Sequence, residues 1–442
     1  MVALDLEKLA KDTKLVPYWN ERCLAIQSDL FLPMSKPNQT SLWQETYLAE
    51  NPIIPTFMIP VKGEASEAGV ENACKKIRVY PANPEKVDNQ IHACRRAYNL
   101  CVAKYREWTK GAKPVDRTKL RRHVREQVKQ ENLERGIKIG TTHLDEACQE
   151  AWRSNQAVIR NRVKGKRSEL RFRKRIATKQ SFIYQRLPQG ILPRVLGDIH
   201  LTEDIPSEAI GKQAVLVREY GRYFLIVKRF IATAAAKTQG NAVGIDPGVR
   251  SFATTYSPEQ ATKFGVEFAW NRLRPLGLQL DKLYSKRKKL FNRWGVLPTQ
   301  LREDLLRCFE KKINRLKQRR NDLIEDLQKR VCHWLVTSYD FIFLPTFETQ
   351  QMSRRAKRRI GSKTVRAMMD LCHYKFKLRL AWMCKKYGKY LIDVNEAYTT
   401  QTQSWDGKLQ EVNRASIISD GTIMVDRDIN GARGIFLRAI TR

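Results

Sequence analysis

The C-terminal half of the sequence alternates short apolar runs with long amphipathic segments, and this alternation is its strongest constraint on the fold. Apolar runs of strand length lie at Ala242–Asp246, Phe341–Leu344 and Tyr390–Val394. Two stretches with apolar stripes at helical spacing, 276–294 and 305–334, separate the first run from the second, and a helix of about Lys363–Lys386 separates the second from the third. Strands that alternate with helices predict an α/β domain.

Two more strand-like runs, Ser251–Tyr256 and Phe264–Trp270, follow a turn at Pro247-Gly248. We predict that they pair as antiparallel strands. A hairpin meander followed by strands alternating with helices suits a ribonuclease-H-like domain, which we place at residues 240–442.

The N-terminal half has a different pattern. A strand at Lys75–Tyr80 precedes a helical pattern over 87–180, and a hairpin joins Ala214–Arg218 to Tyr223–Arg229. These β pieces predict a small barrel interrupted by the helical segment, although two unrelated β pieces would give the same pattern. Residues 1–72 contain six prolines and are interpreted as a partly ordered extension without a legible role.

The chain is strongly basic. It has 82 Lys and Arg against 46 Asp and Glu, a formal net charge of +36, although residues 1–72 are net acidic. Such a surplus repels itself unless a polyanion neutralises it, so nucleic acid is the favoured partner. A ribosome-associated role or an anionic membrane surface is the alternative. No apolar run reaches the roughly 18–20 residues of a membrane span, and we expect no secretory signal.

The densest basic block is Arg160–Arg175, with nine bases and one acid. A run of charge is often only a solvated helix face, but this run interrupts apolar residues that could pack, so we favour phosphate contact. The nine cysteines include no CxxC pair, which predicts reduced intracellular thiols and neither a disulfide framework nor a zinc site.

Acids at the ends of the predicted elements stand out in such a basic chain. Asp246 ends a strand, Glu396 follows Tyr390–Val394, and Asp428 opens the last helix. Three carboxylates at one sheet edge would repel unless cations bridge them, and hard oxygen ligands suit Mg²⁺ or Mn²⁺. Taken singly, Asp246 could only terminate its strand, Glu396 could be solvated, and Asp426 or Asp428 could be an N-cap.

Three motifs carry a resemblance to a known family. The segment 244–252 (GIDPGVRSF) resembles the first RuvC motif of TnpB nucleases, and 428–433 (DINGAR) resembles their third. The segment 344–352 (LPTFETQQM) is similar to Fanzor proteins, the eukaryotic and viral relatives of TnpB. Pro345 stands where TnpB proteins carry the second RuvC glutamate. In Fanzors this glutamate commonly precedes the Tyr-Thr-Ser segment, which implies Glu396, with Glu348 as the rival carboxylate.

The resemblance covers about 74–442 and implies a domain plan. It implies a multidomain α+β protein with a split, OB-like wedge barrel at 73–82 and 181–235, a helical recognition domain at 83–180, and RuvC at 240–442. Family zinc ribbons use two CxxC pairs. Here the four positions are occupied by Gln403, Asp406, Ile417 and Asp420, so we predict a degenerate ribbon at about 398–425 without zinc.

The activity implied by the resemblance is RNA-guided DNA cleavage. A guide RNA would pair with the target strand beside a short motif, and a two-metal Mg²⁺ site of Asp246, Glu396 and Asp428 would cut the DNA. The protein would be a monomer in a ribonucleoprotein, without a membrane partner. Candidate nucleic-acid contacts are Lys75, Lys76, Arg95, Arg96, Arg160, Arg162, Lys164, Lys166, Lys289, Arg427 and Arg433.

Two other functions stay open: an RNA-guided DNA binder with an inactive RuvC site, and a guide-free RuvC-like nucleic-acid binder or nuclease. The family resemblance also implies a nuclear location. The segment 353–359 (SRRAKRR) is either an import signal or a phosphate-contact loop.

Overall fold

The structure is a computed structural model of the 442-residue chain. It describes residues 38–41, 43–48, 57–58, 68–108, 116–175, 177–189, 193–237, 239–292, 298–345, 360–394, 399, 401–410 and 416–440. Its contacts define two units. Unit 1 holds Met1–Gly69, Ala232–Phe309 and Leu316–Arg442, and unit 2 holds Val70–Ile231 and Glu310–Arg315.

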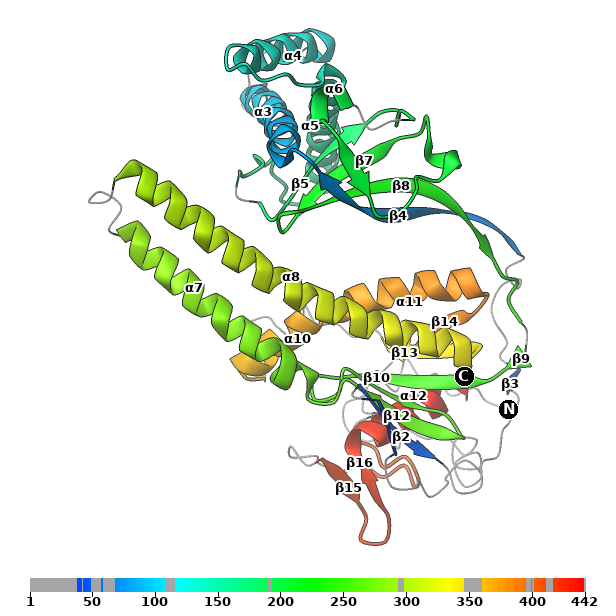
Figure 1. Ribbon diagram of the computed structural model, residues 1–442. Helices are drawn as coiled ribbons and strands as arrows, with labels where there is room; N and C mark the ends of the chain where they lie inside the picture. The colour runs from blue at the N-terminus through cyan, green and yellow to red at the C-terminus, as the bar shows by residue number, and fades with distance from the viewer. Residues whose placement is uncertain are drawn as a thin grey trace. The chain divides into compact units, whose positions relative to one another are not determined.

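Unit 2 combines a five-stranded sheet with three long helices that follow its first strand in sequence (Figure 1). The strands, in spatial order, are β5 (Lys179–Tyr184), β7 (Ala214–Glu219), β8 (Arg222–Thr233), β4 (Gly69–Pro81) and β6 (Ile199–Leu201). The helices are α3 (Pro84–Trp108), α4 (Arg117–Leu133) and α5 (Thr141–Val163), with the short α6 (Pro193–Leu196) and η1 (Ser207–Ala209) further on.

A single apolar core joins the sheet of unit 2 to its helices. Ile77 and Phe182 of the sheet are buried in the same cluster as Val87 and Leu144 of the helices. The predicted hairpin is confirmed: β7 and β8 pair antiparallel through Tyr220 and Gly221, both with positive φ. That conformation gives a turn whose twist matches the strands.

Unit 1 is organised around a seven-stranded mixed sheet. In spatial order its strands are β1 (Asn38–Ser41), β2 (Gln44–Leu48), β12 (Gln260–Phe264), β11 (Ala253–Tyr256), β10 (Ala242–Pro247), β13 (Phe341–Pro345) and β14 (Tyr390–Val394). β10, β11 and β12 form an antiparallel meander, whereas β10, β13 and β14 run parallel. Two short pairs complete the described strands, β3 (Phe57–Met58) with β9 (Gln239–Gly240), and β15 (Ile417–Ser419) with β16 (Met424–Asp426).

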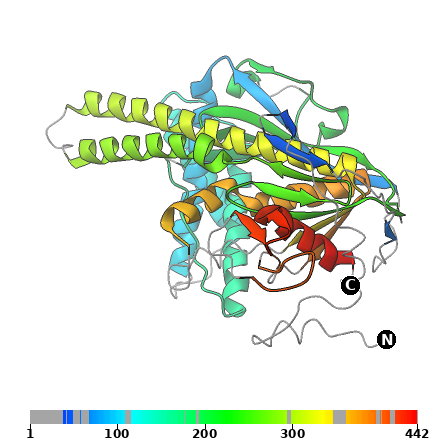
Figure 2. The ribbon, with the colours of Figure 1, turned by 90° about the horizontal axis from the view of Figure 1, so that it is seen from below.

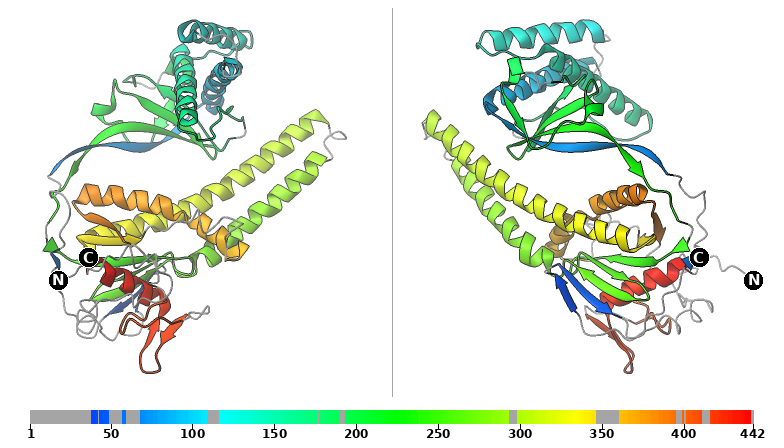
Figure 3. Two further views of the ribbon diagram at one scale, coloured as in Figure 1. Left: turned by 180° about the vertical axis from the view of Figure 1, so that it is seen from behind. Right: turned by 45° about the vertical axis from the view of Figure 1, so that its right-hand side comes forward.

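Helices cover both faces of this sheet (Figures 1 and 2). These are α8 (Thr299–Ser338), α10 (Ser362–Leu371) and α11 (His373–Tyr387) on one face, and α12 (Arg427–Ile440) on the other. The π-helical turn η2 (Ala269–Leu273) leads into α7 (Arg274–Asn292), which extends beyond the sheet. Figure 3 shows α7 and α8 side by side as a long hairpin.

The side chains of β13 alternate between the two faces. Ile342 and Leu344 pack with α8, α10 and α11, while Phe341 and Phe343 pack with α12. This alternation is the reason why the strand reads as one continuous apolar run. The α/β layout predicted for this half of the chain is confirmed.

Two element predictions were wrong in detail. The strand predicted at Phe264–Trp270 is Gln260–Phe264, because positive φ angles at Gly265 and Glu267 turn the chain into η2. The single helix predicted at Lys363–Lys386 is two helices, because Cys372 adopts a left-handed conformation between α10 and α11.

Candidate active site

Asp246 lies at the carboxyl end of β10, on the side of the sheet that α12 covers. Ala242 belongs to the α12-side core, and residues two apart on a strand share a face, so Gly244 and Asp246 point to the same side. Pro247 and Gly248 then turn the chain, and the Gly248 amide donates to the Phe252 carbonyl at 3.3 Å. The turn that follows the strand therefore places Asp246 at the end of the sheet where β10 finishes.

Close packing of α12 on β10 sets the position of Asp428. A Cβ on Gly244 would lie 2.7 Å from the Ala432 carbonyl oxygen and 2.8 Å from the Phe436 Cβ, so only glycine allows this approach. Asp428 precedes Ala432 by one helical turn, and Asp246 follows Gly244 by two strand residues. Both steps amount to roughly 6 Å, so the two acids extend from one contact point toward the same edge.

Asp426, and not Asp428, is the N-cap of α12. Its Oδ1 accepts from the amides of Asp428 (2.9 Å) and Ile429 (3.3 Å), as an N-cap carboxylate does. The other oxygen, Oδ2, is 2.7 Å from the Lys263 Nζ. Because Asp426 caps the helix, the side chain of Asp428 is left for other partners.

Two cations from outside α12 contact these acids: Lys263 of β12, described above, and Arg250 from the turn after β10. The Arg250 Nε and Nη2 lie 3.0 and 2.8 Å from the Asp428 Oδ2, and its Nη2 lies 3.6 Å from Asp426. Burial alone would lower the pKa of Arg250. The negative charges of Asp428 and then Asp426 have the larger combined effect, so the pKa of Arg250 is raised. Arg427 makes a longer contact of 3.4 Å with Asp428.

Sequence reasoning missed Lys263 and Tyr47. Lys263 is buried on β12, and a basic residue inside an otherwise uncharged strand was the available signal. Tyr47 comes from β2, in the extension that the sequence left without a role. Burial, followed by Glu45 and Asp426, raises the pKa of Tyr47 to about 12.

The predicted third carboxylate lies outside the described residues. This holds for Glu396 and for its rival Glu348 alike. β13 and β14 run parallel to β10, so they end at the edge where Asp246 lies. Described β14 ends at Val394, two residues before Glu396, and described β13 ends at Pro345, three before Glu348.

The donor chemistry at this edge fits a hard divalent cation. Asp246 and Asp428 supply carboxylate oxygens, the ligand type that Mg²⁺ and Mn²⁺ prefer. Over the described ranges, no group of three or more His, Cys, Asp or Glu side chains is arranged to hold a metal ion. A complete site would therefore need a ligand from elsewhere in the chain, as the Glu396 prediction requires.

His373 supports the turn that follows Asp246. His373 is 4% exposed, and its ring stacks on Phe252 at 5.1 Å between centroids. Burial lowers the pKa of His373 to about 4, and the nearby Gly248 backbone opposes this shift. The break at Cys372 gives His373 this position at the start of α11.

Hydrogen bonds link the two halves of the predicted ribbon. The Trp405 Nε1 donates to the Asp420 Oδ2 at 2.8 Å, and the Asp420 Oδ1 accepts from the amides of Thr422 and Ile423. Gln403 and Asp406 lie in a turn closed by the Gly407 amide donating to the Gln403 carbonyl at 2.9 Å. The residue types at the four ribbon positions do not fit zinc, which needs thiolate or imidazole ligands in such sites.

Helix α12 anchors this ribbon segment. The Asn430 side chain donates to the Thr402 carbonyl and accepts from the Ser404 amide, both at 2.8 Å. Arg433 is 2% exposed, and its Nη1 donates to the Ser404 carbonyl at 2.6 Å. In this position the Arg433 guanidinium holds the protein's own backbone and does not reach the surface.

The candidate nucleic-acid contacts fall into two groups, those that already interact with another group of this chain and those without an ion pair among the described residues. Several are already paired within the chain: Lys75 with Glu203, Lys76 with Glu219, Arg96 with Glu131, and Arg427 with Asp428. Arg162 donates to the Ser168 carbonyl. Neighbouring like charges on Arg175 and Arg96, after burial, lower the pKa of Arg95. This cluster of positive charges favours the binding of an anion near this part of α3.

Four candidates are exposed and make no ion pair with any acid that the structure describes. They are Arg160, Lys164, Lys166 and Lys289. Part of the basic block is structural, because Arg173 pairs with Glu150 and lies over the Tyr98 ring. The remaining exposed bases suit phosphate contact.

Comparison with known proteins agrees with the sequence motifs. A family model described as "Cas12f1-like, TNB domain" matches residues 373–435. A TnpB-like protein of Acanthamoeba polyphaga mimivirus is 29% identical over 227 residues, 48% of this chain and 40% of that protein. A transposase-named protein of Paramecium bursaria Chlorella virus 1 is 26% identical over 260 residues, 56% of this chain and 55% of that one. The chain thus spans about half or less of the length of these relatives.

Solved structures give weaker matches. A cryo-EM structure of a Cas12f1–sgRNA–target DNA complex has a TM-score of 0.43 and 13% identity, covering 79% of this chain and 82% of that one. A CRISPR–Cas12f ternary complex has a TM-score of 0.30 and 12% identity, with 80% and 81% covered. Among the described residues, no helix has the length and apolar character to cross a membrane.

The sheet order, a meander followed by parallel strands with helices on both faces, defines a ribonuclease-H-like fold, with Asp246 at the end of β10 and Asp428 at the start of α12. Within that fold class, the chain is similar to TnpB-like proteins of giant viruses over about half of its length, as its motifs at 244–252 and 428–433 resemble theirs.

Proposed function

We propose that this protein is an RNA-guided DNA endonuclease of the Fanzor type. The observation that supports the proposal is the close packing of α12 on Gly244, from which Asp246 and Asp428 extend toward one end of the sheet, together with the contact of Arg250 with Asp428. The two acids belong to the two motifs that most resemble TnpB nucleases. A guide RNA and a double-stranded DNA target are the proposed partners of a monomeric protein.

Charge supports nucleic acid as the substrate. The chain carries +36 net charge, and exposed bases such as Lys164 and Lys289 have no acidic partner among the described side chains. Recognition of a heteroduplex through its backbone needs such a surface and no base reading by the protein. A nuclear location remains part of this proposal, and the segment 353–359 lies outside the described residues.

Asp246, Asp428 and Glu396 would hold two Mg²⁺ or Mn²⁺ ions. Such ions supply an activated water and charge stabilisation for the leaving oxygen of a phosphodiester. Arg250 neutralises Asp428 and Asp426 at 2.8 and 3.6 Å, which keeps the carboxylates together despite their repulsion. Lys263 holds Asp426 at the helix cap, so that the first turn of α12 keeps Asp428 at the sheet edge.

The experiment is to express the chain with its native flanking locus and sequence the RNA that co-purifies. One RNA species with a constant part and a variable end is expected. The purified complex should then cut DNA that matches the variable end in Mg²⁺. Asp246→Ala should lower the cleavage rate by at least about a thousandfold with target affinity unchanged.

An inactive RuvC site is the second candidate, because Arg250 already occupies the Asp428 carboxylate. In that case the complex would bind matched DNA but leave it intact in Mg²⁺ or Mn²⁺. Heterogeneous RNA, or none, would contradict the guided function and favour a guide-free binder or nuclease.

A further inference from the structure

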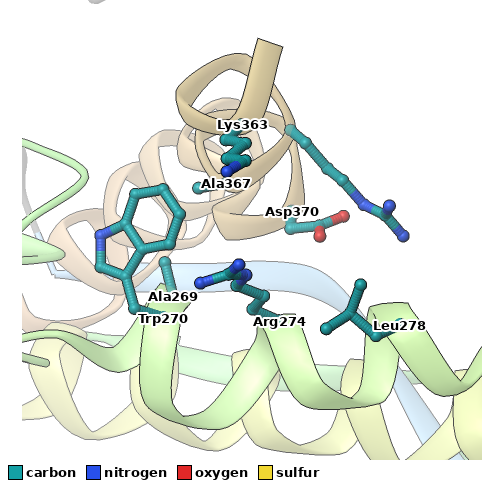
Figure 4. Close-up of a pocket in the computed structure, with 8 residues that line it drawn as sticks. Ala269, Trp270, Arg274, Leu278, Lys363, Ala367 and Asp370 are labelled. Carbon is teal, nitrogen blue, oxygen red and sulfur yellow. The ribbon is translucent and has the colours of Figure 1, made fainter. Parts of the chain in front are cut away.

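A small cavity lies in unit 1 between η2 with the start of α7 and helix α10. Its volume is about 120 Å³, and Trp270, Leu278 and Ala367 supply most of its apolar wall. Figure 4 shows the Trp270 ring at one end, Leu278 at the other, and the Arg274 guanidinium between them, directed toward the ring. The cavity therefore combines a flat aromatic face with a cation beside it.

Both walls of the cavity are attached to the segment that carries the catalytic candidates. On the η2 side, the Glu267 amide donates to the Arg250 carbonyl at 2.7 Å, three residues before Trp270. On the other side, α10 ends at Leu371, and His373, two residues later, stacks on Phe252, whose carbonyl accepts from the Gly248 amide at 3.3 Å. The cavity is thus built on the same 246–250 turn as the acidic edge.

A clamp fixes the separation of the two walls. Arg366 of α10 donates to the Asp281 Oδ2 at 2.6 Å, and its Nη2 donates to the Gly277 carbonyl at 3.2 Å, both on α7. A Cβ on Gly277 would lie 3.0 Å from that Nη2, so the glycine lets the Arg366 guanidinium lie close against α7. The clamp holds the space between the helices open at a fixed width.

The chemistry of the rim fits a nucleotide. Arg274 and Lys363 are exposed cations, and no ion pair joins either to an acid in the described ranges. Asp370 contributes a carboxylate whose Oδ1 accepts from Arg320 at 3.1 Å. An aromatic face binds a base of any kind, cations bind its phosphate, and a carboxylate accepts from base amino or imino groups.

We propose that this cavity binds one base of the single DNA strand that enters the candidate active site. Trp270 stacks on the base, and Arg274 with Lys363 contacts the adjoining phosphates. This inference rests on the proposed function, because it assumes that DNA reaches the acidic edge. A base inside a duplex cannot enter such a cavity, so the subsite selects single-stranded nucleic acid.

The test compares two strands of equal length and charge, oligodeoxythymidylate and an abasic strand, binding to the full chain in EDTA. The wild-type protein is expected to prefer the strand with bases by about tenfold or more. Trp270→Ala should remove most of this preference, and Trp270→Phe should restore it, because a phenyl ring keeps the stacking face. Lys363→Glu should weaken both strands.

Two internal controls keep the test decisive. Affinity of Trp270→Ala for the abasic strand should equal that of the wild type, which shows that the variant is folded and still binds phosphates. Tyr374→Ala removes an aromatic ring that is 70% exposed on α11, and its preference should remain unchanged.

If the wild type and Trp270→Ala preferred oligodeoxythymidylate over the abasic strand to the same degree, and DNA cleavage were intact, the subsite would be overturned and the proposed function would stand. Absence of binding to either strand, together with absence of cleavage, would overturn both.

Discussion

At the scale of single residues, His373 shows how burial selects a protonation state. The imidazole stacks on Phe252, six residues after Asp246, although His373 itself is far from Asp246 in the sequence. Because the ring is almost wholly buried, the neutral form is favoured. Its position makes it a support of the catalytic turn, and it gives a measurable pH dependence.

We expect His373 to reduce stability in acid. Its pKa is about 4 when folded and about 6.5 ordinarily, so the unfolded chain binds more protons between these values. The stability contribution is complete above pH 6.5 and is lost as the pH falls toward 4, by about 3 kcal/mol in total. His373→Phe keeps the stack on Phe252 and should remove this part of the pH dependence.

Denaturant unfolding at pH 7 and pH 5 measures the effect, with the wild type and the variant compared at each pH. An identical loss of stability in both proteins on acidification would contradict the assignment.

At the scale of elements, the contact between β10 and α12 sets the position of Asp428 relative to Asp246. Gly244→Ala would place a methyl group 2.7–2.8 Å from the backbone of α12 at Ala432 and Phe436. The helix must then move away, with a loss of about 1–3 kcal/mol of stability. Cleavage should fall more than the stability loss alone explains, because Asp428 moves with the helix.

Gly361→Ala is the matched control, since nothing lies within 4 Å of a Cβ at that glycine and its φ is ordinary. Thermal unfolding and single-turnover cleavage of both variants give the comparison. Equal behaviour of the two variants would show that the close approach at Gly244 is unimportant.

The ribbon segment should be stable without zinc. A hydrogen bond between Trp405 and Asp420 joins the two halves of the segment. Asn430 and Arg433 of α12 bind its backbone at Thr402 and Ser404. A zinc-selective chelator should therefore leave the melting temperature unchanged. Asp420→Ala, which removes three hydrogen bonds, should lower the melting temperature. A chelator-induced drop in melting temperature would contradict this prediction.

At the scale of the whole molecule, the positive charge should control affinity for DNA. Neutralising six to ten phosphates gives a loss of about a thousandfold or more in affinity between low and moderate salt. Lys164→Ala should reduce the slope of log affinity against log salt by about one. Lys76→Ala should reduce it less, because Lys76 is already paired with Glu219 at 2.7 Å. Equal slopes in both variants would show that the internal ion pair does not decide which bases contact DNA.

Sequence by itself determined the three parallel strands of the C-terminal half and the order of the motifs in this protein. The run Tyr390–Val394 was predicted to the residue, because a short, mainly apolar run follows the turn at Gly388 that ends α11. Asp246 was assigned to the end of its strand because its apolar run stops at the turn Pro247-Gly248. Strand-length patterns and turn residues act over a few positions, so they are legible without the fold.

Tertiary structure alone decided the features that depend on distant partners. β1 and β2, residues 38–48, extend the sheet beside β12, although nothing in their composition indicates a place in it. The break at Cys372 interrupts a segment whose periodicity is helical throughout, because His373 packs under the Asp246 turn. Arg433, expected at a phosphate, is buried against Ser404. Local pattern fixes which residues form an element, whereas long-range packing fixes which side chains meet.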